Sequence, residues 1–215
     1  MDRKQHLYLW LAGIFVTALL IGDLTGGRYF RVGSFDLSAG MLLFPITFVL
    51  TDVVNEFYGP VGAKRITFLG LGLAGLAFLF INVVLALPPS KIGLPSEAVT
   101  QVLGSSRRVY IGSLAAYLIG QLSDIAIFGV FRRLTGHRMI WLRATGSTLI
   151  SQAIDTLVVN AIFLGGTQPI PTIARVMVTA YVLKIVFAVG LTPVIYAAHG
   201  LMFRVLKISE TPEKA

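Results

Sequence analysis

Apolar runs about as long as a bilayer is thick follow one another along the chain, and they restrict its fold more than any other feature. A helix of roughly 20 apolar residues crosses the hydrocarbon core of a membrane. Only 13% of the residues are charged and the mean hydropathy is +0.80, whereas a soluble domain carries about a quarter charged residues. The sequence therefore predicts an all-α integral membrane protein, a single domain over 1–215 with the lipid bilayer as its solvent. The expected bundle has six transmembrane helices, over 7–22, 40–59, 66–87, 110–131, 147–165 and 176–198.

Basic residues are distributed unequally between the two sides of this bundle. Eleven lysines and arginines lie in the two terminal segments and in the second and fourth loops, against six in the remaining loops. By the positive-inside rule, both termini are predicted to be cytoplasmic. The first run lacks a small-x-small cleavage pattern after Gly22, so we expect an uncleaved helix and not a signal peptide.

The net charge of +8 does not indicate a nucleic-acid partner, because the basic residues are dispersed through short loops. The chain has no cysteine, which excludes a disulfide framework and a thiolate metal site. No metal ligand set and no cofactor are expected.

Three polar residues interrupt the second apolar run, LLFPITFVLTDVVNEFYG, and they are Asp52, Asn55 and Glu56. A carboxylate at the middle of a membrane helix costs about 3 kcal/mol or more unless it faces a cavity or a partner, so its presence usually marks a functional site. At 100° per residue, these side chains share one face of the helix with Phe48. That face is polar and aromatic, and the opposite face is apolar.

The fourth and fifth runs each carry a similar polar stripe. Tyr117, Gln121, Asp124 and Phe128 lie on one face of the fourth run, and Thr148, Gln152 and Asp155 lie on one face of the fifth. Counted from the predicted helix ends, the three aspartates lie at one depth, roughly 10 to 12 Å from the inner boundary. Lys184 in the sixth run is predicted to reach the same layer from the outer side.

One lysine cannot neutralise three aspartates and Glu56 in a medium of low dielectric constant. A buried pair between Lys184 and one aspartate that only fixes helix register is the structural alternative. The remaining carboxylates predict that something else binds, and the candidates are protons, a metal cation or an organic solute rich in hydrogen-bond donors.

Several motifs are similar to those of the queuosine precursor transporters, also called the vitamin uptake transporter or DUF165 family. They are FPITFVLTDVVNEFYG followed by Lys64 and Arg65, GQLSD in the fourth run, STLISQAIDT in the fifth and YVLK in the sixth. The resemblance covers almost the whole chain. One departure is Asp23, where an asparagine is expected in the family.

The resemblance implies an importer of 7-deazaguanine bases, the queuosine precursors preQ0 and preQ1, in the bacterial inner membrane. A carboxylate can accept both N–H donors of a guanine-like edge, amides suit its carbonyl, and aromatic rings such as Phe44 can stack on its face. The implied substrate-binding residues are Phe48, Asp52, Asn55, Glu56, Tyr117, Gln121, Asp124, Gln152, Asp155 and Lys184.

Other functions stay open at this point. A substrate-binding subunit of a vitamin importer, energised by a separate complex, would have a similar number of helices, but its expected A-x-x-x-A docking pair is missing from the first run. An intramembrane enzyme is disfavoured, because neither G-x-G-D nor D-D-x-x-D occurs. The sequence does not separate proton-coupled uptake from passive exchange, and it permits a homo-oligomer.

Smaller features predict local structure. Pro45 and Pro193 are expected to perturb the second and sixth helices. Gly70 and Ala74 suit a close helix contact. Ser96 and Glu97 are expected to cap a short surface helix in the longest loop.

Overall fold

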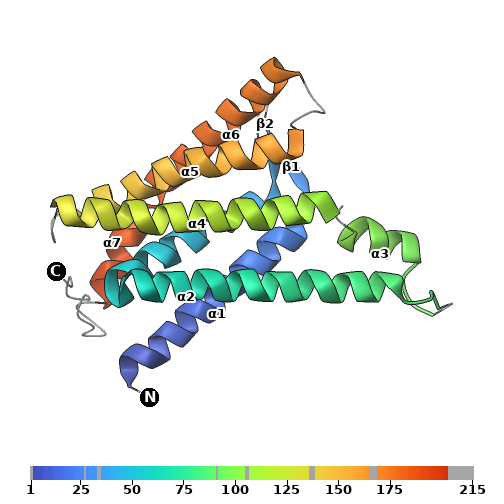
Figure 1. The fold of residues 1–215 in the computed structure, drawn as a ribbon, viewed down its shortest axis with the longest axis horizontal. Coiled ribbons are helices and arrows are strands. Elements are labelled where there is room, and N and C mark those ends of the chain that lie inside the picture. The colour runs from blue at the N-terminus through green and yellow to red at the C-terminus, as the bar shows by residue number, and fades with distance from the viewer. Residues whose placement is uncertain are drawn as a thin grey trace.

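The computed structural model describes residues 2–26, 28–32, 35–90, 92–104, 107–135, 139–164 and 169–202. Most of these residues are helical (Figure 1). Within them, the helices are α1 (Arg3–Thr25), α2 (Phe44–Ala86), α3 (Ser96–Leu103), α4 (Arg107–Thr135), α5 (Ile140–Leu164), α6 (Ile170–Gly190) and α7 (Thr192–Gly200).

Four stretches of the described chain are long and apolar enough to cross a membrane. They are Arg3–Thr25, Pro45–Ala86, Gly112–Thr135 and Ile173–Ala198. The prediction of an all-α membrane protein is therefore confirmed. The predicted end of the fifth helix at Gly165 lies outside the described residues, as do the basic residues Arg204, Lys207 and Lys214.

Helix α2 contains two predicted helices, which meet at a sharp bend. Gly59 has φ 74° and ψ 175°, a left-handed conformation that glycine adopts without steric cost. Pro60 follows and has no N–H to continue the hydrogen-bonding of the first half. The bend falls where the predicted second helix ends, and the second half begins several residues earlier than the predicted start at Ile66.

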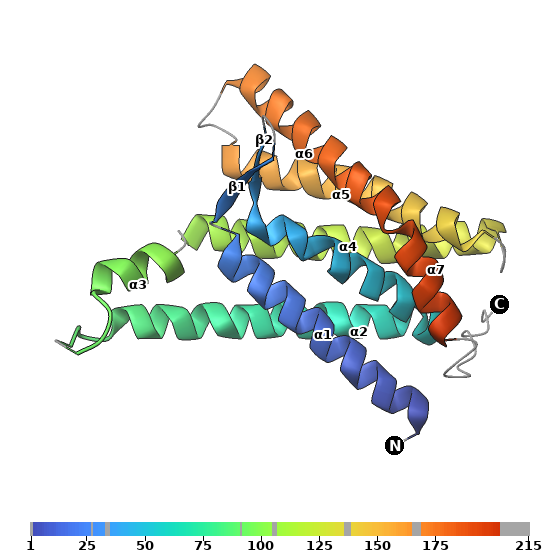
Figure 2. The same cartoon turned by 180° about the vertical axis from the view of Figure 1, so that it is seen from behind.

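Helix α4 occupies the centre of the bundle. It packs against α2 on one side and against α5 on the other, while α1 packs on α2 and α6 packs on α5. Figure 2 shows α1 crossing one face of the bundle, with α6 and α7 forming its other flank. The start of α1, the bend in α2 and the end of α7 lie at the same end of the molecule.

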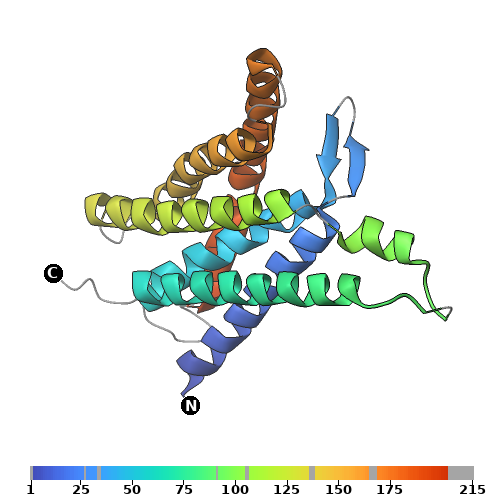
Figure 3. The ribbon, with the colours of Figure 1, turned by 45° about the vertical axis from the view of Figure 1, so that its right-hand side comes forward.

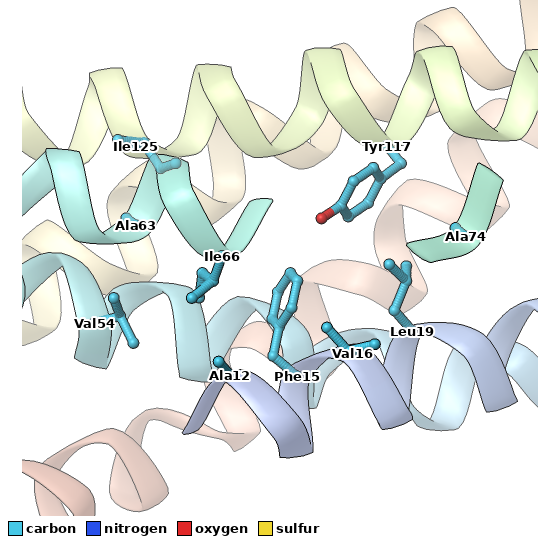
Figure 4. Packing of buried hydrophobic residues seen from close by; sticks show 10 residues of the cluster. All are labelled: Ala12, Phe15, Val16, Leu19, Val54, Ala63, Ile66, Ala74, Tyr117 and Ile125. Carbon is cyan, nitrogen blue, oxygen red and sulfur yellow. The ribbon is translucent and has the colours of Figure 1, made fainter. Parts of the chain in front are cut away.

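A cluster of apolar side chains fills the space between α1, α2 and α4 (Figure 4). Phe15 of α1, Val54 and Ile66 of α2 and Ile125 of α4 are almost completely buried in it. Because lipid is as apolar as these side chains, close packing and hydrogen bonds hold such helices together.

Tyrosine hydroxyls supply some of those hydrogen bonds. Tyr8, Tyr110 and Tyr117 donate to the backbone carbonyls of Gly62, Ala74 and Thr67, at 2.8, 2.5 and 3.0 Å. The second half of α2 is thereby attached to α1 and to α4 along its length.

Gly70 occupies the tightest contact of this cluster. A methyl group at Gly70 would lie 2.8 Å from the Tyr117 hydroxyl and 3.0 Å from the Phe15 ring. Ala74, one turn away, is fully buried. Their predicted role in close helix packing is confirmed, whereas Gly72 faces open space on the same helix.

A β-hairpin that the sequence analysis did not predict precedes α2. Strands β1 (Tyr29–Val32) and β2 (Phe35–Ser38) pair antiparallel, and a short 3-10 helix, η1 (Ala39–Leu42), follows them. Figure 3 shows the hairpin and α3 at the end of the molecule away from the start of α1. The short helix predicted in the longest loop is present as α3, but its N-cap is Pro95 without a side-chain hydrogen bond.

The two prolines act differently. Pro45 lies in the first turn of α2, where a missing N–H has no consequence, so the predicted perturbation is wrong there. In the predicted sixth helix, α6 ends at Gly190 and α7 starts at Thr192, with Pro193 in its first turn. The predicted perturbation at Pro193 is therefore confirmed.

Candidate functional site

The polar residues of α2, α4 and α5 meet where α4 lies between the first half of α2 and α5. Asp52, Glu56, Asp124 and Asp155 are each less than 5% exposed. The first half of α2 and α4 both run toward the end that holds the Gly59 bend, and α5 runs back. Turns of α2, α4 and α5 at the same height therefore lie side by side, and their polar side chains form successive layers along the bundle.

Two carboxyl groups form the middle layer. The side chains of Asp52 and Asp124 lie within hydrogen-bonding distance of each other. The Ser151 hydroxyl donates to Asp124 Oδ1 at 3.0 Å. Asp52 Oδ1 and Asp124 Oδ2 are buried and accept no hydrogen bond from a described residue. Two anions this close repel strongly in a low dielectric, so this carboxyl pair requires a shared proton or a ligand that donates hydrogen bonds.

One turn along α2 from Asp52, toward the Gly59 bend, Glu56 forms an ion pair with an arginine. Arg143 Nη2 lies 2.5 Å from Glu56 Oε1, and both side chains are almost completely buried. Arg132 Nη1 lies 3.4 Å from the carbonyl oxygens of Asn55 and Glu56. In a continuous helix the N–H of residue 60 would bond the Glu56 carbonyl, but Pro60 has none, so Arg132 supplies a donor there.

Toward the other end, Asp155 forms an ion pair with Lys184 of α6. The side chain of Lys184 is 20% exposed, in contrast to the buried Arg143. Gly120 lets the carboxylate lie against α4, since a methyl group there would come within 3.3 Å of Asp155 Cβ. A pair between Lys184 and one aspartate was an open alternative from the sequence, and in the structure Lys184 pairs with Asp155.

The amide side chains border the carboxyl pair. Thr51 Oγ1 lies 3.0 Å from Gln121 Oε1, and Asn55 Nδ2 lies 3.4 Å from the carbonyl oxygen of Ile125. Gln152 is 5% exposed, and its Nε2 has no hydrogen-bond partner among the described residues. Gln152 thus has an N–H donor in the interior of the bundle that no described residue accepts.

The aromatic candidates differ in position. Phe128 is buried and lines a small cavity together with Asp52, Glu56 and Ala144. Phe48 is also buried. Tyr117 belongs to the apolar cluster, with its ring centroid 6.5 Å from that of Phe15. Its stacking role stays a prediction, and the side chain of Phe44 lies outside the described part.

The cavity beside Asp52 has a volume of about 10 Å³, which accommodates one water molecule. A bicyclic base needs far more space. In the conformation described, this cavity is closed to such a solute, and the helices must separate to admit one.

Sequence reasoning missed Arg132 and Arg143, because it assigned both to a cytoplasmic loop. Helix α5 starts at Ile140, seven residues before the predicted start at Ser147. A spacing of four links Arg143, Ser147, Ser151 and Asp155, so extending the helix inward would have put Arg143 on the polar face.

The family model and the relatives that match the chain are all described as transporters. Residues 38–198 match the family model described as "Putative vitamin uptake transporter". The "Probable queuosine precursor transporter" of Bacillus subtilis (strain 168) is 32% identical over 201 residues, which are 93% of this chain and 86% of that protein.

Two further relatives match over a shorter part. The "Queuosine precursor transporter" of Escherichia coli (strain K12) is 31% identical over 57% of this chain and 53% of that protein. The "Probable queuosine precursor transporter" of Haemophilus influenzae (strain ATCC 51907 / DSM 11121 / KW20 / Rd) is 31% identical over 58% of this chain and 51% of that protein. No solved structure matches the chain.

The family model covers most of the chain, and the B. subtilis relative aligns along nearly all of it. The apolar helices of the described residues agree with a protein that crosses the membrane several times. The chain therefore belongs to the vitamin uptake transporter family of multi-pass bacterial membrane proteins.

Proposed function

We propose that the protein imports queuosine precursors, the 7-deazaguanine bases preQ0 and preQ1, across the cytoplasmic membrane. The names of its three relatives support this substrate class. The transporter family and the lipid-facing helices support a carrier and not an enzyme.

The carboxyl pair is the observation that carries the proposal. Of the four buried acids, Glu56 pairs with Arg143 and Asp155 pairs with Lys184. Asp52 and Asp124 form no ion pair with a described residue, and each has a buried oxygen that accepts no hydrogen bond. Such oxygens are unfavourable in an apolar interior by about 1–3 kcal/mol each until a donor reaches them.

A guanine-like edge provides the required donors. Its ring N–H and exocyclic amine point the same way, and a carboxylate can accept both. Gln121 and Asn55 border the pair, and Gln152 Nε2 is available to donate to the carbonyl of the base. Phe48 or Phe128 is the aromatic ring that we expect to cover its face. Glu56 and Lys184 complete the proposed site through their ion pairs.

We infer six membrane-spanning helices with both termini in the cytoplasm. Counting the two halves of α2 separately, and α6 with α7 as one span, gives six. The first turn of α1 and the end of α7 lie at the same end of the molecule. Cysteines introduced at positions 4 and 210 should resist an impermeant reagent applied from the periplasm, and labelling of either would contradict this topology.

Counterflow in liposomes tests the proposed function directly. Purified protein, without a partner or a nucleotide, should exchange external labelled 7-deazaguanine for internal unlabelled base. Liposomes without protein supply the control. Exchange that appears only after a second protein and ATP are supplied would instead indicate a substrate-binding subunit of an energised importer.

Proton coupling at the carboxyl pair is the mechanism we favour. A proton taken up by Asp52 and Asp124 together with the base on the outer side would remove one of the two negative charges of the pair, and both the proton and the base would be released when the cavity opens to the cytoplasm. An imposed inward proton gradient should then drive uptake above equal concentrations. If uptake stops at equal concentrations with and without the gradient, the protein is a passive exchanger.

A further inference from the structure

We infer that Thr156 and Asn160 extend the binding site toward the outer end of α5, as the hydrogen-bonding lining of the route by which a polar heterocyclic solute reaches the carboxyl pair. This inference rests on the proposed function and adds two residues and a direction to it.

Buried polar residues follow one side of α5 at intervals of four. We call Thr148, Gln152, Thr156 and Asn160 the α5 polar track; their side chains are 8%, 5%, 3% and 8% exposed. On the opposite side, Ile150 and Leu157 are 45% and 57% exposed. Helix α5 therefore has one face suited to lipid and one polar face turned into the bundle.

Thr156 departs from the behaviour of other threonines in these helices. A threonine in a membrane helix commonly donates its hydroxyl to the carbonyl four residues earlier. Thr51 and Thr67 do so, at 2.9 and 3.0 Å. Thr156 Oγ1 is buried and has no hydrogen-bond partner among the described residues. Its hydroxyl is left available for another group.

A second unpartnered atom lies one turn further in, at Gln152 Nε2. Asn160, one turn further out, donates Nδ2 to the carbonyl oxygen of Thr156 at 2.7 Å. Two buried polar atoms without partners on successive turns of one helix face are unfavourable in a membrane interior. They indicate that a polar molecule contacts this face during the working cycle.

The chemistry of the track favours a heterocycle over a simple cation. An amide N–H has no favourable contact with a cation, whereas it donates well to a carbonyl or ring nitrogen. A hydroxyl can both donate and accept. The track therefore suits a solute that carries hydrogen-bond acceptors as well as donors, as the heterocyclic base of the proposed function does.

The length of the track indicates a route and not a single pocket. From Thr148 to Asn160 the helix rises about 18 Å at 1.5 Å per residue. Thr148 lies beside Asp124, and Asn160 lies near the end of α5 at Leu164. The solute would move from the end of α5 inward past Asn160, Thr156 and Gln152 to the carboxyl pair.

Single cysteines test the route, because the chain has none of its own. Thr156→Cys and Asn160→Cys are compared with Leu157→Cys and Ala161→Cys, their exposed neighbours on the other face. In right-side-out vesicles, an impermeant cationic thiol reagent should modify the first two at least tenfold faster than the controls. Excess 7-deazaguanine should slow their modification several-fold. Equal rates at track and control positions would overturn the inference, as would a lack of protection by a base that is transported.

An isosteric variant gives a second readout. Thr156→Val keeps the shape of the side chain and removes its hydroxyl, and we expect KM for uptake to rise about fivefold, the equivalent of one hydrogen bond of about 1 kcal/mol. Thr156→Ser should restore the wild-type KM. An unchanged KM in Thr156→Val would contradict a contact with the solute.

The two proposals fail separately. If wild-type protein does not exchange 7-deazaguanine, the proposed function fails, whatever the cysteines show. If it exchanges the base while positions 156 and 160 react no faster than their controls, the proposed function stands and the route fails.

Discussion

Helix α4 makes two sets of contacts that differ in how they hold its neighbours, an apolar set with α1 and the second half of α2 and a polar set with α5 and the first half of α2. Toward α1 and the second half of α2 it presents Tyr117 and Ile125 to an apolar cluster, and the tyrosine hydroxyl is bonded to a backbone carbonyl. To α5 and the first half of α2 it presents Asp124, which contacts Ser151 and Asp52 and has one oxygen without a partner among the described residues.

The apolar contacts hold the helices together, and we call them the scaffold side. The polar contacts are open to a ligand or a proton, and we call them the α5 side. The scaffold side is closely packed, and the Tyr117 hydroxyl on it is hydrogen-bonded. A ligand or a proton would therefore form no additional hydrogen bond there. The α5 side retains unpartnered donors and acceptors beside a water-sized cavity, and a ligand or proton can satisfy them. We therefore expect substitutions on the scaffold side to lower stability and substitutions at the carboxyl pair to lower uptake.

The largest expected effect tests whether the inner ion pair belongs to the scaffold. Arg143→Met leaves Glu56 buried without its cation, and breaking such a pair lowers the free energy of unfolding by about 3–5 kcal/mol. The double variant Glu56→Gln with Arg143→Met should recover most of that loss, measured by titration with a denaturing detergent. A double variant no more stable than the single would show that the pair is not what holds these helices.

Next in size is the carboxyl pair itself. Asp124→Asn keeps the shape of the side chain but removes an acceptor and the shared proton, so uptake should fall roughly 10- to 100-fold, because hydrogen bonds to charged groups contribute about 1.5–3 kcal/mol. Stability should change little. Glu97→Gln on the exposed helix α3 is the matched control and should transport normally. Normal uptake by Asp124→Asn would remove the pair from the site.

The tight contact at Gly70 gives a scaffold test of smaller size. Gly70→Ala pushes a methyl group against Phe15 and Tyr117, and overpacking of this kind costs about 1–3 kcal/mol. Gly72→Ala meets nothing within 4 Å and should be neutral or slightly stabilising. Thermal unfolding in detergent compares the two. Transport per folded molecule should be unchanged in both variants. A selective loss of transport in Gly70→Ala would contradict the claim that scaffold substitutions affect only stability.

The smallest expected effect concerns the close contact between Gly120 and Asp155. Gly120→Ala places a methyl group 3.4 Å from Asp155 Oδ1, while Gly129→Ala on the same helix meets open space. The neighbour must give by a few tenths of an ångström, so we expect KM for uptake to rise two- to threefold in Gly120→Ala only. Equal KM values in the two variants would mean that the position of Asp155 does not matter for uptake.

Much of the membrane fold could be predicted because each span is long and apolar, and the Gly59–Pro60 bend coincides with a predicted helix end. The hairpin β1–β2 escaped prediction because its strands are only four residues long and lie between two apolar runs. At the site, Asp52 and Asp124 were found from their cost in a membrane helix. Arg143 was missed because a basic residue near a helix end is usually in contact with water, whereas the folded bundle buries it in an ion pair with Glu56.

Recognition of the base by the carboxyl pair is tested most directly by competition between substrate analogues during counterflow. A site that hydrogen-bonds a donor rejects a ligand that lacks it, because its own polar atoms would be left unpaired. The analogue without the exocyclic amine should therefore compete much more weakly than 7-deazaguanine, whereas an analogue with a shortened 7-substituent should compete nearly as well. If the desamino analogue competed equally well, Asp52 and Asp124 would not be the groups that read the guanine-like edge.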